Sequence, residues 1–316
     1  MQKKFLKGFG KSFFPKSFPE IIKMTKIAVL VSGGGTNLQA LIDAEKRGEL
    51  GNGKITLVIA SKPGVYALER AKNSGIEGRV LARKEYASIA DYSRALADEM
   101  TAAGIDLVVL AGFLTIIDEQ VYEAFPNRII NVHPALIPSF CGKGYYGLHV
   151  HEAALEKGVR VSGATVHIVT PECDAGPIIL QKAVEVREDD TPEKLQNRIM
   201  EEAEWKILPE AVKLFCEGKI VVENGRAYIK KDKNLSVCGI DCDACKFHLD
   251  KSCAGCRIVA PEGKTVWNGR CDLYDCAAEK KLDHCGKCSK FPCDTLKEWA
   301  SSENPERIQN LIDINE

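Results

Sequence analysis

The chain has 316 residues, more than one compact core of ordinary size usually holds, so its length favours two domains. Hydrophobic residues make up 45% and charged residues 28% of it, as in globular proteins, and the net charge is −1. This balance argues against a partner of opposite charge such as nucleic acid or a membrane surface, and no apolar run approaches the about 18 residues of a membrane span.

The first 24 residues form a basic segment with a separate character. Residues 1–23 carry six lysines and one acidic residue, and they lack the continuous apolar stretch of a secretory signal. They fit a targeting peptide or an extension upstream of a start at Met24, which directly precedes the first predicted strand. We expect residues 1–24 to be disordered or not native.

From Lys26 onward, strand patterns and helix patterns alternate. This rhythm predicts an α/β fold with a mostly parallel, Rossmann-like sheet and helices on both of its faces. The predicted strands are 26–31, 54–60, 79–82, 105–113 and 128–133, and the predicted helices are 36–48, 66–75, 88–104 and 118–125.

The pattern changes in the second half of this domain. Strands at 161–170 and 176–186 are separated by a short polar loop, so we expect an antiparallel addition to the sheet. A threonine and a proline open one long predicted helix at 191–218, and an Asn-Gly pair predicts a hairpin at 219–231. Residues 231–236 are the expected linker.

The glycine-rich stretch "SGGGTN" (32–37) follows the first strand and opens the first helix. Glycines let the backbone approach an anion, and the helix N-terminus offers N–H groups to hold it. Leu38 replaces the third glycine of a dinucleotide fingerprint, and no Gly-Lys-Ser/Thr follows as in a P-loop. The stretch therefore predicts a site for a single phosphate on a small substrate, or else a tight turn without a ligand.

Two further stretches carry groups suited to proton transfer. In "IINVHP", Asn131 and His133 alternate with an apolar residue, so both point to one face where the strand stops. Asp174 lies in the Gly-Pro-rich loop 170–178 between two strands, where it could orient a histidine. The plainer alternatives are a structural histidine and an Asx-turn. No nucleophile motif is present, so the pattern favours direct transfer without a covalent intermediate.

Residues 25–231 resemble the phosphoribosylglycinamide formyltransferase family, the folate-dependent enzymes of purine synthesis. The resemblance implies a formyltransferase fold and transfer of the formyl group of 10-formyltetrahydrofolate to the amine of glycinamide ribonucleotide. Other enzymes that use formyl folate share the Asn-x-His-Pro-x-Leu-x-Pro core. The stretches that carry the resemblance are "KIAVLVSGGGTNLQALIDA", "DLVVLAGFLTII", "RIINVHPALIPSF", "GLHVHEAALEKGV", "SGATVHIVTPECDAGPII" and "AEWKILPEAVKLF".

The resemblance also implies roles for individual residues. Thr115 departs from the family pattern, because a basic residue is common there, and Ala175 replaces a frequent glycine. The implied catalytic residues are Asn131, His133 and Asp174; those implied to bind the ribotide are Gly35, Thr36, Asn37 and Glu204; those implied to bind the folate are Arg83, Leu114, Thr115, Ile116, Ile117 and Thr170.

Two other functions stay open at this point. A formyltetrahydrofolate hydrolase would use the same three catalytic groups on water. A metal-binding sensor or adaptor could be built on a formyltransferase fold, although the catalytic groups are intact. We expect a cytoplasmic monomer or homodimer that binds small-molecule substrates, with neither nucleic acid nor membrane as a partner.

The C-terminal segment, 232–316, is distinguished by its cysteines. Ten of the 13 cysteines lie in it, several in Cys-x-x-Cys pairs that can place two thiolates on one metal. This predicts a small metal-stapled domain with zinc or an iron–sulfur cluster, whereas disulfides or free thiols are the alternative. It resembles a small cysteine-rich domain of unknown function that begins "CGIDCDAC" and closes "HCGKCSKFPC". The candidate ligands are Cys238, Cys242, Cys245, Cys253, Cys256, Cys271, Cys276, Cys285, Cys288 and Cys293.

Overall fold

The computed structural model describes residues 24–231, 233–266, 269–302 and 304–314. The expectation for residues 1–23 lies outside this described part. The chain divides at Lys230/Lys231 into two compact units. None of the described helices is both long enough and apolar enough to cross a membrane.

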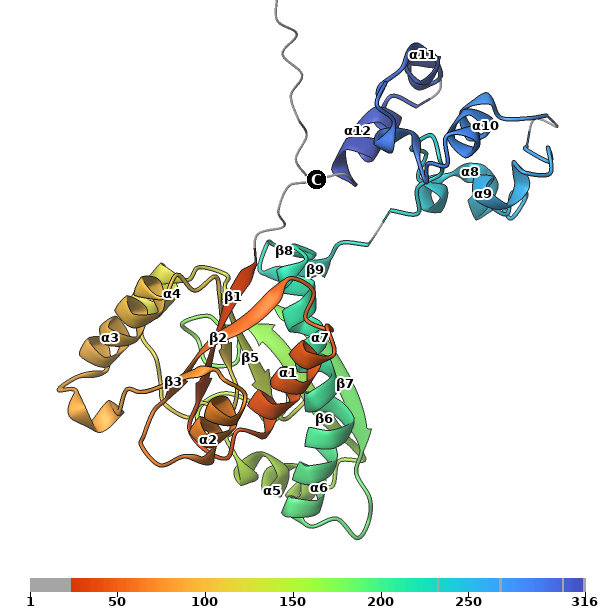
Figure 1. Ribbon diagram of the computed structural model, residues 1–316. Helices are drawn as coiled ribbons and strands as arrows, with labels where there is room; N and C mark the ends of the chain where they lie inside the picture. Colours follow the sequence, from red (N-terminus) through yellow and green to blue (C-terminus); the bar gives the residue numbers. More distant parts are fainter. Residues whose placement is uncertain (1–23, 232, 267–268, 303, 315–316) are drawn as a thin grey trace, which may run out of the picture. The chain divides into compact units, whose positions relative to one another are not determined.

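The first unit is built on a seven-stranded sheet in the order β3-β2-β1-β4-β5-β6-β7 (Figure 1). The pairings among β1 to β5 are parallel, and β6 and β7 join antiparallel at the end, so both sheet predictions are confirmed. The strands are β1 (Thr25–Val31), β2 (Gly53–Ala60), β3 (Glu77–Val80), β4 (Leu107–Leu110), β5 (Ile129–His133), β6 (Val161–Ile168) and β7 (Ile178–Glu185).

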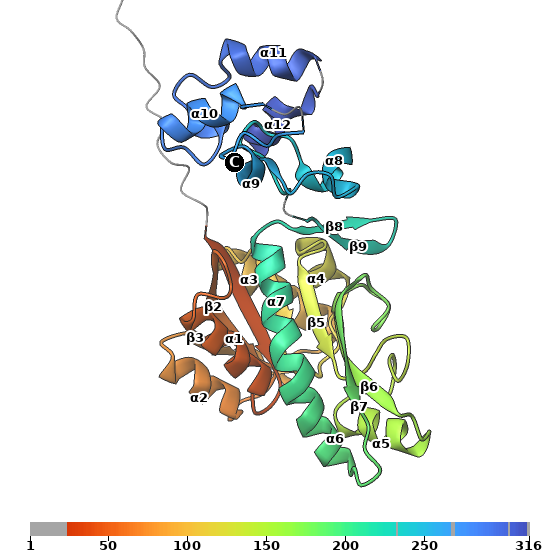
Figure 2. The same cartoon turned by 90° about the vertical axis from the view of Figure 1, so that its right-hand side faces the viewer.

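Helices cover both faces of this sheet. In β1, Ile27 and Val29 belong to one buried core and Ala28 and Leu30 to the other, because successive side chains of a strand point to opposite faces. Figure 1 and Figure 2 show α1 and α7 on one face and α3 and α4 on the other. The helices are α1 (Thr36–Lys46), α2 (Tyr66–Asn73), η1 (Arg83–Glu85), α3 (Ile89–Ala102), α4 (Glu119–Ala124), α5 (Leu148–Glu156), α6 (Pro192–Ile199) and α7 (Trp205–Cys216).

The prediction of one uninterrupted α-helix over 191–218 is wrong in its middle. A π-helical segment, η2 (Met200–Glu204), separates α6 from α7. Pro209 lies inside α7 and lacks the N–H that would bond the Trp205 carbonyl, and the wider π-turn comes immediately before Trp205. Both Ala203 and Glu204 are buried there, so the widened turn brings a carboxyl group inside.

The predicted hairpin is confirmed as β8 (Ile220–Glu223) and β9 (Arg226–Ile229). Its two central residues, Asn224 and Gly225, have φ values of 50° and 73°. Positive φ at both positions is the requirement of a tight type I′ turn, which the Asn-Gly pair meets.

The second unit consists of short helices around a small core. The buried members of that core are Cys238, Ala260, Cys271, Leu273, Leu296 and Leu311. All ten of its cysteines are free thiols. Its elements are η3 (Cys242–Ala244), α8 (Lys246–Leu249), α9 (Cys256–Val259), α10 (Asp272–Glu279), η4 (Cys285–Lys287), α11 (Asp294–Ser302) and α12 (Glu306–Asp313).

A single methyl group at Gly176 is expected to disturb the join between β6 and β7. A Cβ atom there would meet the carbonyl oxygen of Ile168, a backbone atom that cannot move aside cheaply. Overpacking of this kind costs about 1–3 kcal/mol, so Gly176→Ala should lower the free energy of unfolding by that amount in urea unfolding of the full chain. Gly78→Ala is the control, since its Cβ would meet the tip of the Leu68 side chain at 3.2 Å and the Ala71 Cβ at 4.0 Å, and no backbone atom within that distance. Equal midpoints for the two variants would contradict this account.

Candidate active site

The loops that follow the parallel strands meet at one edge of the sheet, where ligands bind in α/β folds. The hydroxyl oxygens of Ser32, after β1, and Ser61, after β2, lie 2.8 Å apart. The backbone N–H of Leu114, after β4, donates to the Ser32 hydroxyl at 2.9 Å. The glycine-rich stretch and the segment after β4 are therefore tied together at this edge.

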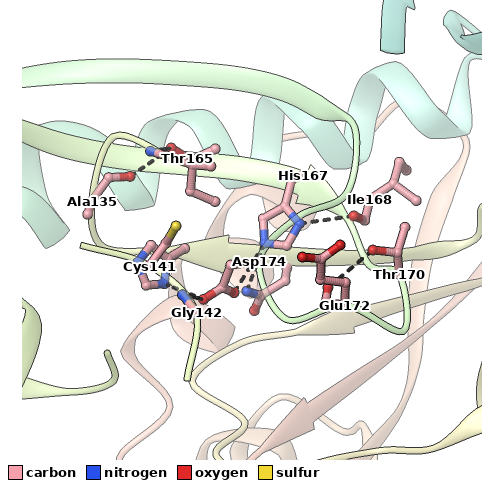
Figure 3. A network of polar contacts seen from close by, with 12 residues as sticks. Ala135, Cys141, Gly142, Thr165, His167, Ile168, Thr170, Glu172 and Asp174 are labelled. Atoms are coloured by element: carbon pink, nitrogen blue, oxygen red, sulfur yellow. Dashed lines mark hydrogen bonds and ion pairs between the residues drawn. The ribbon is translucent and has the colours of Figure 1, made fainter. Parts of the chain in front are cut away.

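The three predicted catalytic side chains lie together at the end of β5. Asp174 Oδ2 is 3.6 Å from His133 Nδ1, and Asp174 Oδ1 is 3.7 Å from Nε2 of His167, on β6. Asn131 Nδ2 is 3.2 Å from the same His167 nitrogen. Figure 3 shows the Asp174 carboxylate between His167 and Gly142. One carboxylate thus faces two imidazoles, with an amide beside them.

Asp174 is held in its charged form by its neighbours. Its backbone is left-handed, with φ 55°, and the Gly142 N–H donates to Oδ2 at 2.8 Å. Burial alone would raise the pKa of Asp174, but hydrogen bonding from His167 and from the Gly142 N–H, with the charge of His133, holds that pKa at about 2. At neutral pH the group is therefore a carboxylate.

His133 is buried and has an acceptor at each ring nitrogen. Nε2 lies 2.8 Å from the Phe140 carbonyl oxygen, which can only accept, so Nε2 carries a proton. Nδ1 faces the Asp174 carboxylate. Burial lowers the pKa of His133, while Asp174 and the Phe140 carbonyl oppose that effect. A proton taken up at Nδ1 would lie between imidazole and carboxylate, so this nitrogen is suited to accept and return one.

His167 is a member of the site that the sequence motifs did not assign. Its Nδ1 lies 2.9 Å from the Ile168 carbonyl oxygen, which can only accept, so Nδ1 carries a proton and Nε2 faces Asn131 and Asp174. His167 pairs with Asn131 across the antiparallel β5–β6 ladder. A correct register between these two strands would have found it, because directly opposed residues share a face.

A second network holds the proline-bracketed loop after β5. The Thr165 hydroxyl donates to the Ala135 carbonyl at 2.7 Å and accepts from the Ile137 N–H at 3.1 Å. Gln181 donates to the Ile137 carbonyl at 2.9 Å. Side chains of β6 and β7 therefore hold the loop after β5 in place. This loop includes Phe140, whose carbonyl oxygen lies against His133.

The residues implied to hold the ribotide come together around a buried carboxyl group. Asn37 Nδ2 donates to Glu204 Oε2 at 2.6 Å, and Thr36 Oγ1 lies 3.7 Å from the sulfur of Met200. Burial raises the pKa of Glu204 to about 7, and the Asn37 hydrogen bond opposes that rise. The buried Asn37 Oδ1 has no hydrogen-bond partner among the described residues. Gly35 begins α1 with φ 73°, where a Cβ would lie 2.7 Å from that of Ala67.

The residues implied to hold the folate do not all lie together. Leu114 and Ile116 are 61% and 71% exposed on the loop after β4, where they offer apolar surface, while Ile117 is buried in the core. Thr115 between them is half-buried. Thr170 donates to the Glu172 carbonyl in the β6–β7 loop.

Arg83 belongs to a different part of the sheet. It follows β3, the edge strand, whereas the loop 111–117 follows β4, which is the fourth strand in the sheet order. Its guanidinium donates to the Tyr86 carbonyl at 2.9 Å. The backbone N–H of Arg83 donates to the Ser61 carbonyl at 3.3 Å, so Arg83 adjoins the pair of serines to which Leu114 is bonded.

The comparisons with known proteins agree with this fold. Residues 25–212 match the formyl transferase family, which is the class of enzyme that the sheet and the Asn-His-Asp arrangement define. A phosphoribosylglycinamide formyltransferase of Haemophilus influenzae is 38% identical, and the match covers 65% of this chain and 94% of that protein. A chloroplastic one from Arabidopsis thaliana is 41% identical over 66% of this chain and 72% of its own length.

A solved structure extends the comparison. Glycinamide ribonucleotide transformylase 1 from Symbiobacterium toebii is 45% identical, with a TM-score of 0.62, over 66% of this chain and 95% of that one. The chain belongs to the phosphoribosylglycinamide formyltransferase family. Residues 234–298 match a second family, described as a protein of unknown function (DUF3795).

Proposed function

We propose that residues 25–231 transfer the formyl group of 10-formyltetrahydrofolate to the amine of glycinamide ribonucleotide, which gives formylglycinamide ribonucleotide and tetrahydrofolate. The observation that carries this proposal is the Asp174 carboxylate facing His133 and His167 beside Asn131, at the strand end of a formyltransferase fold. Residues 232–316 form a separate cysteine-rich domain in this proposal.

The transfer needs one bond to form, one to break and one proton to move. The ribotide amine attacks the formyl carbon, and the bond from that carbon to the folate nitrogen breaks. Asn131 donates to the oxygen that becomes an oxyanion, and a donor of this kind is worth about 10²–10³-fold in rate. His133, once it has taken up a proton at Nδ1, adds a nearby positive charge that steadies the same oxygen. Asp174 holds His133 and helps to pass the amine proton to the departing nitrogen. The 3.6 Å and 3.7 Å separations are apo distances that would tighten or admit a water.

The substrate assignments rest on the chemistry of the surrounding groups. The glycine-rich turn at the start of α1 suits a phosphate, and Gly35, Thr36, Asn37 and Glu204 provide polar groups for the rest of the ribotide. The exposed Leu114 and Ile116, with Thr115, Ile117 and Thr170 assigned to the same pocket, suit the flat pterin of the folate. Arg83 belongs to this set only as a weaker match to a basic position of the family.

One assay separates the transferase from the hydrolase that would use the same groups on water. Purified protein is mixed with 10-formyltetrahydrofolate, with and without glycinamide ribonucleotide, and release of tetrahydrofolate is followed. We expect release only when the ribotide is present. Release at the same rate without the ribotide would assign the hydrolase, and no release in either mixture would overturn both enzymatic functions.

Glu204 is expected to make the protein less stable as the pH rises. The pKa of its carboxyl is about 7 in the folded protein against an ordinary value of 4.5, so the folded state keeps a proton that the unfolded chain loses. Stability is therefore lost between pH 4.5 and about 7 and stays lost above it. The difference between these values corresponds to about 3 kcal/mol. Glu204→Gln should be more stable than the parent by up to that amount at pH 8 and equal to it at pH 4, in urea unfolding.

The matched control is Glu202→Gln, since Glu202 lies in the same π-helical segment but is exposed. It should leave the pH dependence unchanged. The two variants should also differ in substrate binding. The KM for the ribotide should rise about 10-fold or more for Glu204→Gln and stay unchanged for Glu202→Gln, because only the first change removes a hydrogen bond to a charged group. A pH-independent stability difference for Glu204→Gln would contradict the burial of an ionisable carboxyl.

A further inference from the structure

The ten free cysteines of the second unit line two cavities. A cavity of about 240 Å³ is lined by Cys276, Cys285, Cys288 and Cys293. A larger one, of about 630 Å³, is lined by the other six, Cys238, Cys242, Cys245, Cys253, Cys256 and Cys271. The smaller cavity thus has four of the cysteines and the larger one has six. The spacing of the cysteines in the sequence does not predict this division.

In the larger cavity, four of the six thiols form two Cys-x-x-Cys pairs. Cys242 and Cys245 bracket η3, and Cys253 and Cys256 lie either side of the turn that starts α9, so each pair has two intervening residues. The Gly255 N–H donates to the Cys253 sulfur at 3.3 Å. Backbone donors to sulfur are typical of thiolate metal centres.

In the smaller cavity, one of the four thiols contacts a cation. Lys280, which lines the same cavity, places Nζ 3.0 Å from Cys276 Sγ. Cys285 and Cys288 flank η4, which turns the chain tightly between them. A nearby cation offsets part of the negative charge of a four-thiolate centre.

Cys238 and Cys271 are different from the other eight. Both are buried members of the unit's apolar core. Cys238 Sγ contacts the Ser236 hydroxyl at 3.3 Å and accepts from Arg307 Nη1 at 3.4 Å. Cys271 caps the start of α10. We assign these two residues to the packed core, which leaves eight cysteines, four at each cavity.

We propose that the C-terminal unit binds two thiolate-ligated metal centres. One is held by Cys242, Cys245, Cys253 and Cys256, and the other by Cys276, Cys285, Cys288 and Cys293. Among the described residues, no three His, Cys, Asp or Glu side chains converge on one point as they stand, so the thiols must rotate inward around the metal. Tetrahedral coordination by four thiolates is the usual structural zinc site. The apolar cluster of this unit has six buried members among the described residues, so bound metal would add to a small core.

The test is the metal content of the full chain, purified under reducing, oxygen-free conditions from medium that contains zinc and iron. We expect two zinc ions per chain. Stepwise titration of the unaltered protein with a mercurial should release each zinc as four thiols react, which measures the ligand number without any variant. Two clusters, measured as iron with acid-labile sulfide, would support the same ligand sets with a different occupant. Disulfides, or ten free thiols without metal, would overturn the proposal.

Variants test how the cysteines are divided. Cys245→Ser and Cys288→Ser should each retain one of the two metals. Cys271→Ser, within the same unit, and Cys173→Ser, an exposed cysteine of the first unit, should each retain both. Loss of a metal from Cys271→Ser, with the other metal retained, would show that the division into these two sets is wrong.

Discussion

Asp174→Asn should lower kcat/KM for formyl transfer by about 10³-fold or more, since it removes the charge that supports a proton on His133. The amide is nearly the same size and can still accept from the Gly142 N–H, so the loop should keep its path. The asparagine amide is neutral, so it cannot stabilise an imidazolium. It also carries an NH₂ donor, whereas the carboxylate that it replaces offers only acceptors to His133 and His167. The measurement is steady-state kinetics with both substrates at saturating and limiting concentrations.

Glu172→Gln is the control for this change, because Glu172 lies exposed on the same loop two residues away. It should leave the rate within about two-fold, which is ordinary for a surface change that touches no reacting group. The variant at 174 should also keep the circular dichroism spectrum of the parent. Turnover close to that of the parent by Asp174→Asn would remove this carboxylate from the mechanism.

His133→Gln is expected to lower kcat/KM by about 10²–10⁴-fold, the range of general acid–base contributions. A glutamine can still donate to the Phe140 carbonyl, so the hydrogen bond that positions the side chain is preserved while proton transfer is lost. His149→Gln is the matched control, since His149 is exposed and its ring interacts with the surface side chains of Glu152 and Tyr146.

The double variant sharpens the test. If His133 and Asp174 act as one unit, His133→Gln in the Asp174→Asn background should cost little more than either change alone, because groups that act together are strongly non-additive. Losses that multiply fully would show that the two side chains act in independent steps. The pH profile adds a second check: burial lowers the pKa of His133, so the acid limb of the rate in the unaltered enzyme should lie below the ordinary histidine range.

Much of the site could be predicted from the sequence because it depends on local rules. Alternation along a strand places Asn131 and His133 on one face, and a polar loop between two strands presents Asp174. The resemblance to a known family added the residues implied to bind the ribotide. Two of these residues, Asn37 and Glu204, form a hydrogen bond of 2.6 Å. The antiparallel addition to the sheet followed from the change in pattern near residue 160.

The parts that could not be predicted depend on contacts between distant segments. His167 enters the site through the register of β5 against β6, and a shift by one residue would turn it to the other face. The links from Arg83 through Ser61 and Ser32 to Leu114 depend on the order of the strands, which no local pattern encodes. The cysteine pairs were visible in the sequence, whereas the division of the ten thiols between two cavities depends on how short helices pack.

The π-turn at 200–204 has a role comparable to that of a bulge in a strand. An α-helix repeats its inward-facing positions every three or four residues, and Leu195, Ile199 and Ala203 follow that rule. The widened turn admits the next residue as well, and α7 then resumes with Ile207, Leu208 and Ala211 inside. A helix that would otherwise supply only packing thus carries one ionisable group to the interior, between two stretches that remain in contact with the sheet.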